Sequence, residues 1–309
     1  MPDLTDPTRA TSTAIGRRAF AVLSAGAAAL AGAAPALAQA DAFGRPHPPI
    51  VPEDDPAIVT ERPTIAYRTA DPGGDRTIDS YFAAPKNAGP ATPSVVVVQA
   101  IWGIDAQLRD VVRRFAQAGY AALAPNLYAG LDAPNGDGAT DFSPFRSIAS
   151  KLADSVVDGD VRNAAYHLKS RFARTKTAVI GFCMGGGIAL RQTVDAADVF
   201  AAASVFYGKV RYGTTGDAGT ITPIALAYAP DIRVPALGSW GARDTSIRAD
   251  DVRALGAALE ARHAPHDFKI YDEAGHAFFD DTRSSYVPGP AADAWARTLA
   301  WFAQRLASA

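Results

Sequence analysis

The sequence lacks the features that are typical of disulfide-bonded, metal-binding or nucleic-acid-binding proteins. Its 309 residues contain one cysteine, so no disulfide can form within the chain. A formal net charge of −2 provides no basic field to attract nucleic acid or an anionic membrane. The histidines and the cysteine lack metal-ligand spacing, and the glycine run 185–187 lacks the residues of a phosphate-binding loop. We therefore expect a small-molecule partner, no metal or other cofactor, and no nucleic acid.

The N-terminus is distinct from the rest of the chain, whose 48% hydrophobic and 20% charged residues are typical of a globular protein. Arg17 and Arg18 precede a stretch rich in alanine, leucine and glycine, residues 21–34, which resembles a twin-arginine export signal. Two small-x-small cleavage sites follow, ending at Ala38 and Ala40. Residues 1–40 are therefore predicted to be a signal peptide, and the mature protein is expected to be exported to the periplasm.

An uncleaved membrane anchor is the alternative interpretation of this segment. The apolar stretch is shorter than the ~20 strongly apolar residues that a membrane span requires, and it consists largely of alanine and glycine. We therefore expect no stable membrane span after processing. The sequence gives no indication of the oligomeric state.

The mature chain is predicted to begin with an arm and to continue as one domain. Residues 41–63 contain six prolines, whose fixed φ angles and missing N–H groups favour an extended arm without regular structure. Residues 64–69 and 77–83 are strand-like runs separated by Asp71-Pro72-Gly73-Gly74, a pattern typical of a β-hairpin. Residues 64–309 are assigned to a single domain, because no internal repeat or second composition zone follows.

Strands and helices alternate through the rest of the chain. The β-branched run at 94–99 is typical of a strand buried on both faces. Residues 126–145, rich in Asn, Asp, Gly and Pro, are predicted to be a functional loop such as a lid. The alternation predicts an α/β fold, a doubly wound and mostly parallel sheet with helices on both faces. Further strands are predicted at 120–124, 177–180, 201–206, 234–240 and 268–271. Helices are predicted around 108–115, at 154–172, from the glycine-rich turn after 177–180 to about 194, at 249–262 and at 291–307.

The single cysteine lies in a pattern typical of a nucleophile elbow. Gly181-Phe182-Cys183-Met184-Gly185 places cysteine where the strand–turn–helix motif G-x-S-x-G has serine. Glycines are needed two residues on either side, because a Cβ there would strike the neighbouring strand or helix. The helix N-terminus favours a thiolate and offers the N–H of Met184 to an oxyanion. The alternative is that Cys183 is a small buried residue packed after a strand.

A nucleophile at an elbow requires a base, and the position of His276 fits this role. It follows the predicted strand at 268–271 on a loop with Gly275, whereas the other four histidines lie in the arm, in a helix or at a helix end. Asp244 comes directly after the strand at 234–240, where it can orient the imidazole. The order Cys183, Asp244, His276 is also the order of the triad in α/β hydrolases.

Together these residues resemble the dienelactone hydrolase family of the α/β-hydrolase superfamily, also called carboxymethylenebutenolidases, over residues 75–307. The resemblance implies a carboxylic ester hydrolase with a catalytic triad of Cys183, His276 and Asp244. It also implies that the N–H groups of Ile101 and Met184 are the oxyanion donors. It rests further on the segments QAIWGI at 99–104, RDV at 109–111, GY at 119–120, APNLY at 124–128, FYG at 206–208 and AGHAF at 274–278.

Two positions depart from the family pattern. The family usually has a glutamate where this sequence has Ala100, and that carboxylate hydrogen-bonds the resting thiol and assists thiolate formation. The bacterial members bind a substrate carboxylate with arginines, one of them four residues after the histidine, where this sequence has Asp280. Arg146 and Arg283 are the candidates to replace it. Neutral esters or lactones are therefore favoured over an anionic dienelactone.

The expected activity is hydrolysis of esters or lactones through a thioester on Cys183. Candidate substrate-binding aromatic residues are Trp102, Tyr128, Tyr207 and Phe278, with packing in the core as the alternative for each. An exported carboxylesterase acting on other acyl compounds is a second hypothesis. A weakly active or non-catalytic ligand-binding protein is a third, because Ala100 replaces the family's glutamate.

Overall fold

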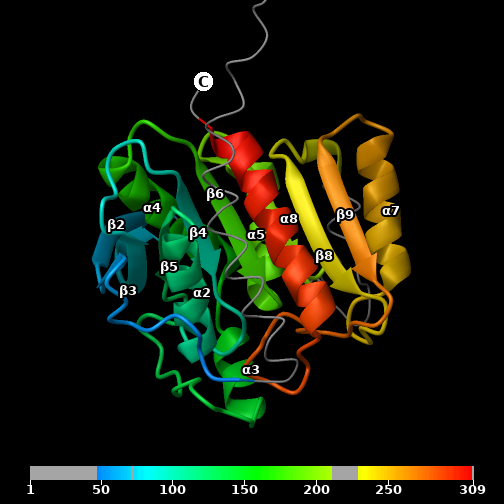
Figure 1. The fold of residues 1–309 in the computed structure, drawn as a ribbon, viewed down its shortest axis with the longest axis horizontal. Helices are drawn as coiled ribbons and strands as arrows, with labels where there is room; N and C mark the ends of the chain where they lie inside the picture. The colour runs from blue at the N-terminus through cyan, green and yellow to red at the C-terminus, as the bar shows by residue number, and fades with distance from the viewer. Residues whose placement is uncertain (1–46, 71–72, 211–228, 308–309) are drawn as a thin grey trace, which may run out of the picture.

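The fold is known from a computed structural model that describes residues 47–70, 73–210 and 229–307 (Figure 1). The predicted signal peptide at 1–40 and residues 41–46 of the predicted arm lie outside these ranges, so their assignment stays a prediction. Within the described ranges, no helix is both long and apolar enough to cross a membrane.

A mostly parallel β-sheet forms the centre of the molecule (Figure 1). Its strands follow the order β1-β3-β5-β4-β6-β7-β8-β9, and β2 pairs with β3. β3 is antiparallel to β1, β2 and β5, whereas each neighbouring pair from β5 to β9 is parallel. The predicted α/β fold with a doubly wound, mostly parallel sheet is thus confirmed. The strands are β1 (Ile58–Glu61), β2 (Thr64–Ala70), β3 (Gly73–Pro85), β4 (Ser94–Val98), β5 (Ala121–Pro125), β6 (Thr177–Phe182), β7 (Phe200–Phe206), β8 (Ala236–Gly241) and β9 (His266–Tyr271).

Helices cover both faces of the sheet. On one face lie α2 (Ala106–Gln117) and α8 (Pro288–Leu306), and on the other lie α4 (Asp154–Arg171) and α5 (Met184–Asp195). The edge strand β9 is contacted by α7 (Ala249–Glu260). The short helix α3 (Ser143–Ala149) lies beyond the end of the sheet toward which the arrows of β8 and β9 point (Figure 1).

Local sequence explains where these elements begin and end. In β4 five consecutive buried residues, SVVVV, fit a strand that is covered on both faces. Helix α2 begins after Asp105, whose carboxylate accepts a hydrogen bond from the N–H of Leu108 at 2.9 Å. It ends before Gly119, whose φ of 93° is a left-handed conformation that terminates helices. The helix predicted around 108–115 is therefore confirmed.

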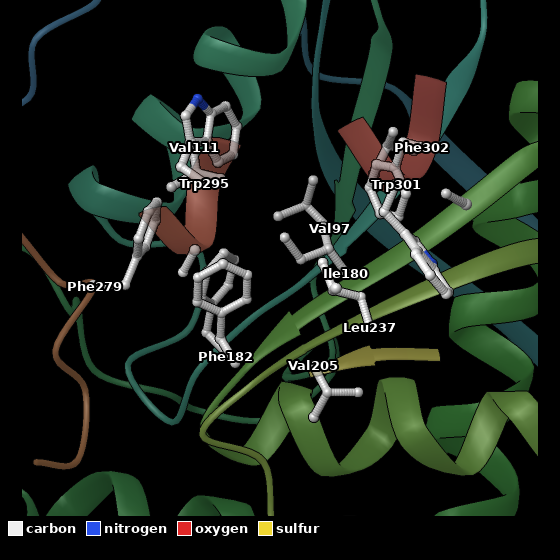
Figure 2. Packing of buried hydrophobic residues seen from close by; sticks show 14 of the residues in the cluster. Val97, Val111, Ile180, Phe182, Val205, Leu237, Phe279, Trp295, Trp301 and Phe302 are labelled. Atoms are coloured by element: carbon white, nitrogen blue, oxygen red, sulfur yellow. The ribbon is translucent and has the colours of Figure 1, made fainter. Parts of the chain in front are cut away.

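The main core lies between the sheet and the helix pair α2 and α8. Figure 2 shows Val97 and Ile180 of the sheet beside Phe302 of α8. At one end of this core, the rings of Phe182 and Phe279 stack with centroids 5.4 Å apart. Phe182 directly precedes the cysteine and Phe279 follows the histidine by three residues. This aromatic contact therefore joins the segments that carry the predicted nucleophile and base.

The structure differs from the sequence prediction in three segments. Residues 58–61 of the predicted arm form β1, because this stretch has no proline and its backbone pairs with residues 82–85 of β3. Helix α3 begins inside the predicted loop 126–145, with Pro144 in its first turn. Helix α8 begins at Pro288 rather than at 291. The N–H that proline lacks is one that the first turn of a helix leaves unpaired, so Pro288 can begin α8 and Pro144 can occupy the first turn of α3.

Candidate active site

Cys183 lies on a sharp turn between β6 and α5. Its φ of 53° is in the left-handed region, a strained conformation for a residue with a side chain. The N–H of Cys183 donates to the carbonyl of Phe206 at 3.1 Å, and its carbonyl accepts from the N–H of Gly187 at 3.2 Å. A Cβ on Gly181 would overlap the carbonyl group of Gly185. The prediction that this turn requires glycine for steric clearance is confirmed.

The structure brings the three predicted triad residues together. Nε2 of His276 lies 3.1 Å from Sγ of Cys183, and Nδ1 of His276 lies 2.7 Å from Oδ2 of Asp244. Asp244 follows β8 by three residues and His276 follows β9 by five, so both come from the carboxyl ends of parallel strands. Oδ1 of Asp244 accepts the N–H groups of Ser246 and Ile247. The imidazole is thus held in one orientation between the thiol and the carboxylate.

Electrostatics in this group favour a charged imidazole. Burial disfavours the imidazolium, but the hydrogen bonds to Asp244 and Cys183 outweigh burial and raise the pKa of His276 to about 10. Burial opposes ionisation of Asp244 as well, yet its hydrogen bond to His276 and the charge of that ring hold the pKa of the carboxyl below its usual value. An imidazolium beside Sγ stabilises a thiolate, so the pair can supply both a nucleophile and an acid.

The two predicted oxyanion donors are backbone N–H groups of Ile101 and Met184. Met184 is the first residue of α5, where an N–H has no partner within the helix. Ile101 follows β4 on a turn that is held by a hydrogen bond from the Tyr128 hydroxyl to the Ile101 carbonyl at 2.7 Å. Among the described residues, no hydrogen bond occupies either N–H. Their role as oxyanion donors stays a prediction.

Three of the predicted aromatic residues lie close to these groups. Tyr207 is buried, and the centroid of its ring lies 5.3 Å from that of His276. Trp102 and Tyr128 pack with Ile101 in a small apolar cluster. Both also line part of a neighbouring cavity of about 280 Å³. These three side chains remain candidates for contact with a substrate.

Phe278 does not line the site, and this prediction is wrong. The side chain is 0% exposed and packs in the core with the rings of Phe206, Tyr207 and Tyr271. The cause is the turn that precedes it, since Ala277 adopts a φ of 58° and the chain reverses there. An apolar residue next to a reactive histidine therefore serves to anchor the loop.

The two candidate arginines are not placed to receive a substrate carboxylate. Nε of Arg283 donates to Asp280 at 3.0 Å, its Nη1 donates to the carbonyl of Ala139 at 2.6 Å, and its guanidinium lies 3.9 Å from the ring centre of Trp102. Arg146 is exposed on α3, with its guanidinium over a neighbouring phenylalanine ring. Both assignments are corrected, because Arg283 is neutralised by Asp280 and Arg146 faces solvent.

Sequence reasoning missed two buried carboxylates in this region. Burial raises the pKa of Asp105 to about 6, although its carboxylate caps α2. The spacing of Asp105 and Leu108 at a helix start was a usable signal for this cap. Asp281 had no local signal, because its partner Arg114 lies 167 residues away. In the described part of the chain, no group of His, Cys, Asp or Glu side chains could hold a metal ion.

Comparison with known sequences gives consistent matches. The sequence profile described as "Dienelactone hydrolase family" matches residues 78–306, more than half of the chain. A protein of Escherichia coli (strain K12) named "Putative carboxymethylenebutenolidase" is 35% identical over 261 residues, covering 82% of this chain and 90% of that protein. A Salmonella typhimurium protein of the same name is 35% identical over 242 residues, covering 76% of this chain and 86% of that protein.

A solved structure supports the same assignment. The crystal structure of a "Putative Dienelactone Hydrolase" from Klebsiella pneumoniae subsp. pneumoniae is 36% identical with a TM-score of 0.66. The match covers 78% of this chain and 99% of that chain. The matched range of the family profile includes the elbow and the loops of Asp244 and His276. The chain therefore belongs to the dienelactone hydrolase family, with its α/β-hydrolase fold.

Proposed function

We propose that this protein hydrolyses neutral carboxylic esters or lactones through a thioester on Cys183. The observation that carries the proposal is the hydrogen-bonded chain from Sγ through the imidazole to Asp244, at 3.1 and 2.7 Å, on a nucleophile elbow. Family membership supports the broader activity, that of a dienelactone hydrolase-like hydrolase. The roles of nucleophile, acid–base group and orienting carboxylate are the finer part of the proposal.

The first half of the proposed reaction forms the acyl-enzyme. The Cys183 thiolate attacks the carbonyl carbon, a C–S bond forms, and the electron pair of the C=O bond moves to oxygen. The N–H groups of Ile101 and Met184 bind this oxyanion. When the intermediate collapses, the ester C–O bond breaks and the His276 imidazolium protonates the departing alkoxide. For a lactone, this alkoxide stays attached to the acyl group.

The second half hydrolyses the thioester. Neutral His276 takes a proton from water, and the water oxygen attacks the thioester carbonyl. The C–S bond then breaks, which releases the carboxylic acid and restores the Cys183 thiolate beside an imidazolium. Asp244 accepts a hydrogen bond from Nδ1–H throughout, so Nε2 is the nitrogen that exchanges protons with the substrate and with water.

The family usually has a carboxylate at the position of Ala100, and it assists ionisation of the thiol. In this chain His276 alone activates the Cys183 thiol. Among the described residues, Nε2 of His276 is the one side-chain atom that hydrogen-bonds Sγ of Cys183. Because the pKa of His276 is raised to about 10, the ring carries its proton at neutral pH. This favours a resting thiolate–imidazolium pair that exists before substrate arrives.

Charges near the site favour a substrate without a negative charge. Asp280 lies at the position where the family resemblance implies an arginine, and it is buried and engages Arg283. Burial, and then the negative charge of Asp280, raises the pKa of the Tyr207 hydroxyl next to His276. Because Asp280 and Arg283 neutralise each other, a carboxylate on the substrate would find no ion pair with Arg283.

Mass spectrometry of the protein during turnover tests the proposal. The protein is mixed with p-nitrophenyl acetate, quenched in acid and digested. We expect steady release of nitrophenolate and an acetyl group on the peptide that carries Cys183. A mono-p-nitrophenyl succinate should show a kcat/KM about 10-fold below that of its neutral methyl ester, because the charged acid loses hydration in the site and Arg283, engaged by Asp280, offers it no ion pair.

The matched control is Cys183→Ala, which should keep the fold and lose both hydrolysis and acetylation. Acetylation of another residue during turnover would contradict the assignment of the nucleophile. Binding of the ester without release of nitrophenolate by the wild-type protein would contradict the enzymatic proposal and support a ligand-binding protein.

The pH dependence of thiol alkylation tests the resting ion pair. An ordinary thiol reacts about 25-fold faster with iodoacetamide at pH 9 than at pH 7, because its thiolate fraction grows across that range. Cys183 is the only thiol of the chain, so its rate can be measured directly. We expect a change of less than about 3-fold between these pH values, because His276 stays protonated up to about pH 10. A 25-fold rise would contradict the ion pair.

We also propose that the reaction takes place outside the cytoplasm, in the periplasm. This proposal depends on the paired arginines and the small-x-small sites of residues 1–40, which lie outside the described residues. A lone thiol with no disulfide partner is compatible with export, since the fold needs no oxidation step.

A further inference from the structure

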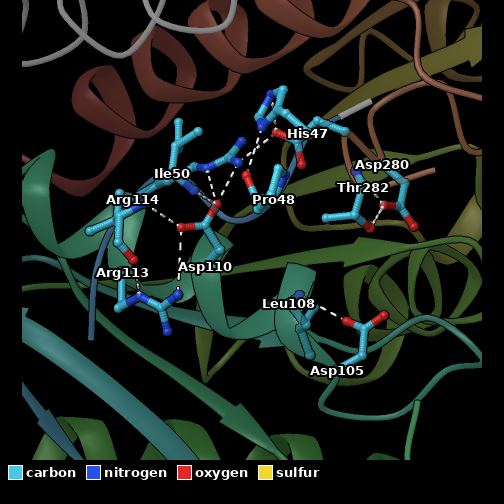
Figure 3. Close-up of polar contacts among 12 residues, drawn as sticks. His47, Pro48, Ile50, Asp105, Leu108, Asp110, Arg113, Arg114, Asp280 and Thr282 are labelled. Carbon is cyan, nitrogen blue, oxygen red and sulfur yellow. Dashed lines mark hydrogen bonds and ion pairs between the residues drawn. The ribbon is translucent and has the colours of Figure 1, made fainter. Parts of the chain in front are cut away.

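The segment that follows His276 is tied to helix α2 by buried charges. Asp281 is 2% exposed, and its Oδ2 accepts Nη2 of Arg114 at 2.5 Å. Nε of Arg114 also donates to Asp110, one turn earlier in α2, at 2.8 Å. Figure 3 shows Asp110 at the centre of this network. Because all three groups are buried, loss of one carboxylate would leave Arg114 with a single charged partner and unbalance the charge of the network.

The N-terminal arm completes the same network. The N–H groups of Ile50 and Val51 donate to the two carboxylate oxygens of Asp110, at 3.2 and 2.8 Å (Figure 3). Nε of Arg113 donates back to the carbonyl of Val51 at 2.6 Å. The arm is therefore held by side chains of α2, and the side chain of Val51 joins the main core.

At His47 the arm also contacts the segment after His276. The N–H of His47 donates to the carbonyl of Asp281 at 2.7 Å, and its Nε2 lies 3.8 Å from Oδ2 of the same residue. The ring of His47 packs edge-on against Tyr286, with centroids 5.9 Å apart. Residues 277–287 are thus contacted both by α2, through Arg114, and by the arm, through His47.

Short hydrogen bonds close this segment next to His276. The N–H of Val287 donates to the carbonyl of Phe278 at 3.0 Å, and Oγ of Ser285 donates to the carbonyl of Ala277 at 3.1 Å. Residues 277–287 therefore form a closed loop whose base adjoins the imidazole.

We infer that Asp281 is a positioning residue for His276, and that docking of the arm, residues 47–51, completes the support of the Cys183–His276 pair. The expected loss of kcat rests on the proposed function. The expected displacement of the His276 ring from Cys183 does not depend on it. The arm then contributes to the position of His276, in addition to linking the N-terminal segment to the domain. A chain that loses residues 47–51 would keep all triad residues but hold the imidazole less firmly.

The variant Asp281→Asn tests the inference. The amide keeps the shape of the carboxylate and removes its charge from Arg114. We expect kcat for p-nitrophenyl acetate to fall about 10-fold with KM changed less than about 2-fold, because a misplaced imidazole slows chemistry more than binding. Alkylation of Cys183 by iodoacetamide should regain the steep pH dependence of an ordinary thiol.

The matched control is Asp160→Asn on the opposite face of the sheet. Asp160 is also buried and hydrogen-bonds an arginine, with Nε and Nη2 of Arg76 at 2.6 and 2.7 Å. Its replacement should lower stability and leave both kcat and the alkylation profile unchanged. If Asp281→Asn behaves in the same way, with stability lowered and both functional readouts intact, the positioning role is overturned.

A second variant keeps the test decisive if Asp281→Asn does not fold. His47→Ala removes the ring from Tyr286 and leaves the charges of α2 in place. We expect faster deuterium exchange in peptides covering 277–287 and a kcat lowered about 3-fold, and unchanged exchange and kcat would contradict the role of the arm. If the wild-type protein hydrolyses no ester, the alkylation profiles are compared instead. A steep profile in the variants beside a flat one in the wild type supports the positioning role, and the same profile in both contradicts it.

Discussion

The variant His276→Gln is expected to lower kcat/KM for p-nitrophenyl acetate about 10⁴-fold. Glutamine retains hydrogen-bonding capacity but can neither protonate the departing alkoxide nor take a proton from water. It also removes the imidazolium 3.1 Å from Sγ of Cys183, so the thiolate loses its stabilising charge. Steady-state hydrolysis, together with iodoacetamide alkylation at pH 7 and pH 9, measures both consequences.

The matched control is His266→Gln on β9. That imidazole hydrogen-bonds the carbonyl of Ala264 at 2.9 Å and takes no part in the candidate site. Its variant should hydrolyse the ester at the wild-type rate. A kcat/KM for His276→Gln within about 10-fold of wild type would contradict the acid–base role, and would leave the hydrogen bond to Cys183 as a purely structural contact.

The variant Gly185→Ala is expected to lower the free energy of unfolding by about 3 kcal/mol or more. A Cβ at this position would overlap the backbone carbonyls of Val98 and Gln99. Backbone atoms at the end of a central strand cannot move aside as a flexible side chain can, so the helix must shift away from the sheet. Urea unfolding followed by circular dichroism measures the loss.

The control for this substitution is Gly89→Ala. A Cβ there would meet no atom within 4 Å, and the glycine does not have a positive φ. Its stability should stay within about 0.5 kcal/mol of wild type or rise slightly, because alanine reduces the freedom of the unfolded chain. Equal urea midpoints for both variants would show that the close approach at the elbow is not rigid.

Much of the fold could be predicted because its signals are local. A strand covered on both faces must be apolar throughout, as β4 is, and the turn to α5 requires glycine on both sides of Cys183. The positions of His276 and Asp244 could be predicted for a related reason. Loops at the carboxyl ends of parallel strands meet at one edge, so their order along the chain limits which side chains can meet.

The errors concern two side chains of the segment that follows His276. Arg283 was a reasonable candidate for binding a carboxylate, but the folded chain brings Asp280 and the Trp102 ring against it. Phe278 was a reasonable lining residue, but the turn at Ala277 directs it into the core. No motif encodes the positive φ of Ala277, and the contact of Arg283 with Trp102 depends on which segments the fold places side by side.

The sequence by itself determined the local chemistry of this protein: a cysteine between obligatory glycines, one histidine and one aspartate at strand ends, and an alternation that specifies a parallel sheet. Only the tertiary structure decided how the imidazole is held. The network of Asp110, Arg114 and Asp281 joins the arm, a helix and the histidine loop across up to 167 residues. Such buried charges are stable only when all partners are present, and that condition is met by the packing of whole elements rather than by any local pattern.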